Sequence, residues 1–200
     1  MDEKLYKELS QLTKDKNIWK ENIPYIASLL KNRSAKIVAK ALWLLGEMGL
    51  RYPQEAAPYI GEIATFIGSD NDLLRERSAN ALGRIGRADC KLIMPFMNEL
   101  CSLAKDKSPN VRLSFIWASE NIATNAPTVY KDCLTIFADL LNDENERVRI
   151  EAPEMFRVLG KRVPEFVEPY LDKLKDMADH DEVNVVRIHA AGAIKATISH

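Results

Sequence analysis

The sequence predicts an all-α protein, an α-α superhelix in which antiparallel helix pairs stack in a line. Related segments start at residues 57, 94, 131 and 168, so the chain repeats every 37 residues. Each segment holds two stretches whose apolar residues recur at helical spacing. Asn-Gly and Asp-Gly hairpin turns and sustained period-two alternation, the usual signals of strands, do not occur in the sequence.

The first element is an amphipathic helix within residues 1–22. Leu5, Leu9 and Leu12 lie at i, i+4 and i+7, with charged residues between them. We expect this segment to cap the apolar end of the stack, because terminal repeats must hide a face that inner repeats bury against neighbours. Five repeats follow in what we expect to be a single domain, over residues 23–56, 57–93, 94–130, 131–167 and 168–200.

Within each repeat a first helix starts near a proline. Pro58 opens one such helix, and Ile60, Ile63, Ala64 and Ile67 then form a one-sided apolar stripe. Proline is favoured at a helix start, because its missing N–H would have no intrahelical partner there.

The second helix of each repeat begins after a polar turn. In the fourth repeat the turn starts at Asp143, and Val148, Ala152, Met155 and Leu159 are expected to point inward. An arginine recurs at the start of these helices, usually six residues after an aspartate. Because a guanidinium can bind both a carboxylate and turn carbonyls, these residues predict struts between repeats. The set is Arg75, Asp106, Arg112, Asp143, Arg149, Asp181 and Arg187.

The repeat period, the opening proline, the Asp-x5-Arg turn and the tail Ala81–Gly86 resemble HEAT repeats. The resemblance covers residues 20–200. It implies a stacked solenoid of the kind found in nuclear transport receptors and phosphatase scaffold subunits. The chain departs from the pattern at Val38, where an arginine is expected, and at Ile122-Ala123, where Ile-Gly is expected.

In such stacks the second helices line the concave side, and the stripe opposite their core positions is the predicted partner-binding surface. Trp43 and Trp117 occupy the same repeat position in this stripe, and Trp and Arg are common at binding hot spots. The alternative is that both tryptophans pack between repeats. The stripe is basic in the middle and acidic later, which would orient a bipolar segment. The full set is Lys40, Trp43, Arg77, Asn80, Arg84, Arg87, Trp117, Asn121, Glu151 and Glu154.

Several classes of function are disfavoured. The phosphate-binding glycine loops, the nucleophile elbow and Cys/His zinc spacings are missing from the sequence, so we expect no catalytic residues, no metal and no cofactor. A net charge of -1 argues against a nucleic-acid partner. No apolar run reaches the roughly 20 residues that cross a bilayer, and the polar start Met1-Asp2-Glu3-Lys4 argues against a secretory signal. An odd number of cysteines without CxxC spacing suggests reduced thiols in the cytoplasm.

The sequence therefore predicts a non-catalytic scaffold or adaptor that binds a protein or peptide segment. One alternative is a DNA-binding enzyme similar to HEAT-like alkylation-repair glycosylases. The residues that would hold a damaged nucleotide are then Trp43, Trp117, Arg77, Arg84 and Glu154. Another is a lyase or chaperone for a tetrapyrrole-carrying protein, although such proteins have shorter repeats. The last repeat has no capping segment, which suggests self-association through its apolar surface.

Overall fold

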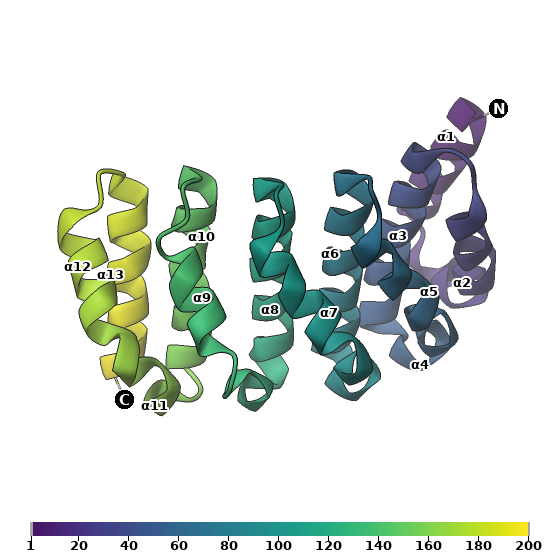
Figure 1. Cartoon of the computed structure of the whole chain (residues 1–200). Coiled ribbons are helices and arrows are strands. Elements are labelled where there is room, and N and C mark those ends of the chain that lie inside the picture. The colour runs from purple at the N-terminus through teal and green to yellow at the C-terminus, as the bar shows by residue number, and fades with distance from the viewer. Residues whose placement is uncertain (1, 200) are drawn as a thin grey trace. The chain divides into compact units, whose positions relative to one another are not determined.

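The computed structural model describes residues 2–199, and every regular element in this range is an α-helix or a 3₁₀-helix. The chain divides into two compact units, residues 1–100 and 101–200. Figure 1 labels the helices of both units, which are described separately below.

The first unit is built around two long second helices, α3 and α6, which pack against each other. Gly46 permits their close approach, because a Cβ atom added there would lie 2.8 Å from the Cα of Ala81. The helices α2 and α5 cover one side of this pair, and α1 contacts α3. The helices of this unit are α1 (Asp2–Leu12), α2 (Trp19–Ser28), α3 (Ala35–Arg51), α4 (Pro53–Ala56), α5 (Ile60–Thr65) and α6 (Asp72–Ala88).

The second unit has three second helices, with α10 packed between α8 and α13. Its core contains the stacked rings of Phe115 and Phe137, whose centroids are 5.2 Å apart, and Tyr130, which meets Phe137 edge-on. The short helix α7 (Met97–Ser102) spans the boundary of the two units. The other helices are α8 (Pro109–Asn125), α9 (Leu134–Leu140), α10 (Glu146–Gly160), α11 (Pro164–Val167), α12 (Leu171–His180) and α13 (Asn184–Ile198).

The first helices are shorter than the apolar stripes suggest. Pro58, Pro95 and Pro169 each lie in a 3₁₀ turn, and the α-helix starts only after it. Several first helices also end in a 3₁₀ turn, for example at Phe66–Gly68. Pro24 differs, because it lies inside α2, which starts at Trp19 rather than near Ile23.

The expected helix within residues 1–22 is divided in two. The helix α1 ends at Leu12, and the side chain of Asp15 then caps a 3₁₀ turn by accepting a hydrogen bond from the amide of Asn17. Trp19 is 3% exposed and donates from Nε1 to the carbonyl of Leu12 over 2.8 Å. Leu9 is fully buried. The end of α1 is therefore tied to the first repeat by both packing and a hydrogen bond.

Candidate functional site

Two of the recurring arginines of the second unit, Arg112 and Arg149, link neighbouring repeats. Arg112 donates from Nη1 to the backbone carbonyl of Asp106 in the turn of its own repeat. The same guanidinium meets the carboxylate of Asp143, in the turn of the next repeat, through Nε and Nη2, each at 2.7 Å. Arg112 is only 8% exposed, and the hydrogen bond to Asp143 is the main reason that its pKa is raised. The arrangement positions the polar turns and presents little charge to a ligand.

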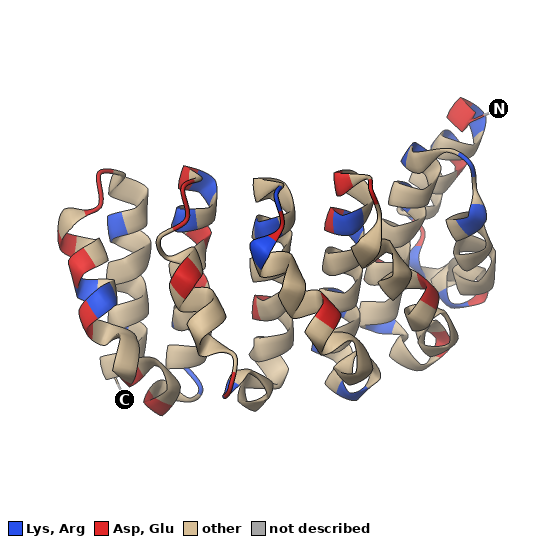
Figure 2. Cartoon of the chain, viewed as in Figure 1, with Lys and Arg blue, Asp and Glu red and all other residues tan. Residues whose placement is uncertain are grey.

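Arg149 repeats this geometry one repeat later. It donates to the carbonyl of Asp143 and contacts the carboxylate of Asp181 at 3.3 Å. Arg187 donates to the carbonyl of Asp181, and in the first unit Arg75 donates to the carbonyl of Ser69. Figure 2 shows the acidic turns that precede α10 and α13, with basic residues in the first turns of those helices.

The predicted stripe of the first unit lies on α3 and α6. Lys40, Trp43, Arg77, Asn80 and Arg84 are half-buried, and Arg87 is exposed. The Nε atom of Arg84 lies 2.7 Å from a carboxylate oxygen of Glu47 on α3. Of the arginines expected to make α6 basic, Arg84 therefore has its charge compensated by Glu47.

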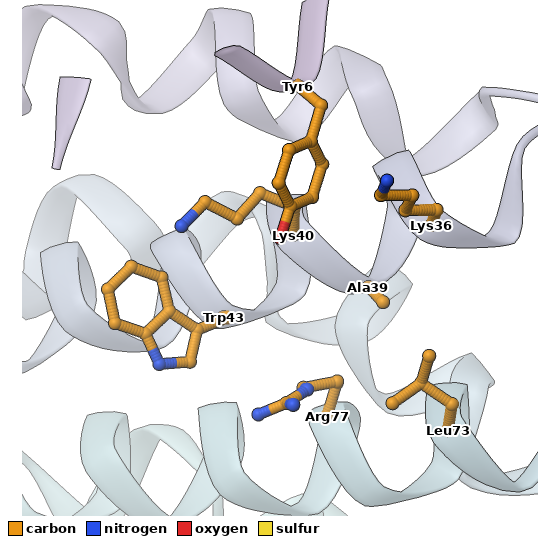
Figure 3. A pocket seen from close by; sticks show the side chains of 7 residues that line it. All are labelled: Tyr6, Lys36, Ala39, Lys40, Trp43, Leu73 and Arg77. Carbon is orange, nitrogen blue, oxygen red and sulfur yellow. The ribbon is translucent and has the colours of Figure 1, made fainter. Parts of the chain in front are cut away.

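A pocket of about 270 Å³ opens at the other end of this stripe. Figure 3 shows Lys40 extending between the rings of Tyr6 and Trp43, with Arg77 approaching from α6. Tyr6 and Lys36 were not among the predicted site residues. Tyr6 belongs to α1, whose contact with α3 brings its ring to the pocket, and Lys36 lies one helical turn before Lys40.

In the second unit the predicted residues lie on α8 and α10. Trp117 on α8 is 36% exposed, and its backbone carbonyl accepts a hydrogen bond from Asn121. Glu151 and Glu154 lie on α10 and are half-buried. Glu154 pairs with Arg157 on the same helix and lies 3.3 Å from Nδ1 of His189 on α13.

Glu120 on α8 lies near enough to Glu151 and Glu154 to feel their charges, although it is not among the residues predicted from the sequence. Its Oε1 atom is buried and accepts no hydrogen bond from the described residues. Burial, followed by the nearby charges of Glu151 and Glu154, raises the pKa of Glu120 to about 8, while Arg157 opposes the shift. Glu120 lies three residues after Trp117, so helical geometry alone placed it beside the predicted stripe.

A second pocket, of about 450 Å³, lies between α10 and α13. Arg157, Lys161 and Lys195 line it together with small residues. On α13 the side chains of Ile188 and Ile198 are 58% and 64% exposed.

Within residues 2–199 no three His, Cys, Asp or Glu side chains gather in a way that could hold a metal ion. No helix in the same range is long and apolar enough to cross a bilayer.

A family model described as HEAT repeats matches residues 97–195. A designed armadillo repeat protein in complex with peptide (KR)4 superposes with a TM-score of 0.74 at 18% identity, covering 98% of this chain and 94% of the other. A computationally designed armadillo repeat protein for modular peptide recognition gives a TM-score of 0.67 at 18% identity, with the same coverage. An engineered protein gives 0.69 at 14% identity, covering 90% and 80% of the two chains. The comparison with curated proteins gives no match.

Proposed function

The chain is a HEAT-repeat solenoid, and we propose from this premise that it is a non-catalytic scaffold or adaptor. It binds a protein or peptide segment through the face formed by its second helices. The observation that carries this proposal is the placement of its tryptophans. Trp19 is buried in the core, whereas Trp117 is 36% exposed and Trp43 lines an open pocket. Tryptophans accessible at one repeated position are well suited to anchor a partner.

The solved structures of similar fold support the same function. Two of them are designed armadillo repeat proteins, one described in complex with peptide (KR)4 and the other as made for modular peptide recognition. A repeat stack offers an extended surface suited to an elongated ligand. We extend peptide binding to this chain on that basis.

The charged side chains of each unit suggest which charged groups of a partner that unit would bind. Around Trp43 the pocket carries Lys36, Lys40 and Arg77, while Glu151 and Glu154 place two half-buried carboxylates on α10 in the second unit. We expect the first set to favour acidic groups of a partner and the second set to favour basic ones. Such charge complementarity contributes more to specificity and association rate than to affinity.

The alternative of a DNA-binding enzyme receives less support. Of the residues it requires, Arg84 is paired with Glu47, and Glu154 is paired with Arg157. Ion-paired arginines contribute little to phosphate binding, which depends on cations that can replace counterions.

Two further features belong to the proposal. We assign the chain to the cytoplasm, because Cys90, Cys101 and Cys133 are all free thiols and a reducing compartment favours that state. We also propose that the exposed isoleucines of α13 support self-association. A monomeric mass by light scattering at high micromolar concentration would argue against this second point.

The proposed function is tested by affinity capture from the lysate of the source organism, with and without nuclease. The bait is used as the wild-type chain and as the Trp43→Ala/Trp117→Ala variant. We expect a specific protein that the wild type retains after nuclease treatment and the variant does not. Recovery that disappears with nuclease, or equal recovery by both baits, would refute the proposal.

A further inference from the structure

The pocket of the first unit concentrates positive charge from two helices. Lys36 and Lys40 come from α3 and Arg77 from α6. Arg77 has one carboxylate near it, that of Glu76 at 3.7 Å. Within residues 2–199 neither lysine forms an ion pair. Three cations therefore share a small space, and among the described residues only Arg77 has an ion-pair partner, Glu76.

The ammonium groups of the two lysines contact aromatic rings and not carboxylates. The Nζ atom of Lys36 lies 4.5 Å from the ring centroid of Tyr6, and that of Lys40 lies 4.2 Å from the indole of Trp43. Ring faces attract cations, but at partly exposed sites this attraction is weak. The rings thus hold the ammonium groups in place and leave their charge largely uncompensated.

The environment of Lys40 agrees with this reading. Burial, followed by the nearby charge of Arg77, lowers the pKa of Lys40. An anion entering the pocket would relieve the repulsion between these two cations.

Beyond the pocket, one of the cations of α6 is compensated by a carboxylate. Two turns further along α6, Arg84 is matched by Glu47 at 2.7 Å. A strand of nucleic acid needs a track of unpaired cations along its backbone, and Arg84, which is paired with Glu47, does not extend the cluster of the pocket in this way. The apolar groups of Ala39 and Leu73, which also line the pocket, suit the aliphatic stem of an acidic side chain.

We propose that this pocket binds the carboxylate of an aspartate or glutamate in an acidic segment of a partner protein. Lys36, Lys40 and Arg77 contact the carboxylate, and Tyr6 and Trp43 pack against the side chain that bears it. The inference rests on the proposed function, because it supplies the chemistry by which one unit recognises a partner segment. It also gives α1 a second role, since Tyr6 completes the pocket.

The test uses the full chain and a hexaglutamate peptide at low salt, with hexaglutamine as the neutral control. The Trp117→Phe background makes the fluorescence change report chiefly on Trp43, because Trp19 is buried. We expect saturable binding of hexaglutamate, a change in Trp43 emission, and no response to hexaglutamine. The Lys40→Gln/Arg77→Gln variant should weaken binding about tenfold or more, because charge-assisted contacts are lost.

Matched controls separate a pocket effect from net charge. Lys91 is exposed and lies outside the pocket, so Lys91→Gln should leave the affinity within about twofold at moderate ionic strength. A circular dichroism melt shows whether each variant is folded, and Lys40→Gln alone serves if the double variant is not. Equal loss with Lys91→Gln, or no binding of hexaglutamate by the wild type, would overturn the proposal.

Two other ligands complete the experiment. Tighter binding of a single-stranded oligodeoxynucleotide, or of inorganic phosphate, than of hexaglutamate would also overturn the assignment to carboxylates. Failure of this inference is distinguishable from failure of the proposed function. If hexaglutamate does not bind but retention of the captured protein still requires Trp43 and Trp117, only the assignment of the pocket to carboxylates is wrong.

Discussion

Arg112 and Asp143 form a two-point ion pair between consecutive repeats of the second unit, with both donor–acceptor distances at 2.7 Å. The guanidinium also holds the carbonyl of Asp106, and the carboxylate accepts a hydrogen bond from the amide of Asn145. One residue pair thus fixes two turns and the start of two helices. This is why the recurring arginines are better understood as struts than as ligand contacts.

Replacing Asp143 by Ala should lower the free energy of unfolding by about 3 kcal/mol, because Arg112 is left as a buried charge without its partner. Urea denaturation measures this change. Glu144 provides the control, since it is a carboxylate in the same turn whose side chain is 93% exposed and 4.0 Å from Arg112. Glu144→Gln should cost less than about 0.5 kcal/mol. Equal effects of the two substitutions would contradict the role assigned to Asp143.

The close contact of α3 and α6 predicts an unusual response to alanine. Alanine normally stabilises a helix by about 1 kcal/mol relative to glycine. At Gly46 the new Cβ atom would meet the backbone of Ala81 at 2.8 Å, and overpacking of this kind costs about 1–3 kcal/mol. We therefore expect Gly46→Ala to lower the melting temperature. Gly61→Ala, whose nearest contact would be Phe96 at 3.9 Å, should leave it unchanged or raise it.

Stability should depend on pH through Glu120. Its pKa is raised from 4.5 to about 8, so between these values the folded state holds a proton that the unfolded state has released. Stability consequently falls as the pH rises from 4.5 to 8, and the loss is complete above that range. Glu120→Gln should remove this loss, making the variant more stable by on the order of 2 kcal/mol near pH 8 and equal to the wild type below pH 4.5.

Urea denaturation at several pH values checks this prediction. Glu165→Gln is the control, because Glu165 is exposed on α11. Parallel pH profiles for Glu120→Gln and the wild type would show that Glu120 is ionised in the folded state at neutral pH, contrary to the expectation.

The three tryptophans should differ in their contribution to stability. Trp19 is buried, so Trp19→Ala should cost about 3–5 kcal/mol. Trp117 is 36% exposed, so Trp117→Ala should cost only about 1 kcal/mol. We expect the Trp43→Ala/Trp117→Ala variant to remain folded by thermal melting while it loses its partner. A collapse of its thermal transition would mean that these tryptophans belong to the core.

The repeats and the inner face of the second helices could be predicted because a periodic sequence reports directly on a periodic structure. The pairing of Arg84 with Glu47 could also have been predicted, because the two residues hold the same position in adjacent repeats, 37 residues apart. The position of Tyr6 in the pocket could not be predicted, because it depends on how α1 packs against α3. The raised pKa of Glu120 likewise depends on carboxylates of another helix, whose distance no local pattern encodes.

The central claim, that a partner binds the second helices, is tested most directly by hydroxyl-radical footprinting of the complex with the captured protein. Trp43 and Trp117 report on the proposed face. Met94 and Tyr25, which are 47% and 37% exposed in segments outside the second helices, are the controls. We predict that the partner lowers oxidation of both tryptophans and leaves both controls unchanged. Protection of Met94 and Tyr25 with unchanged tryptophans would contradict the claim.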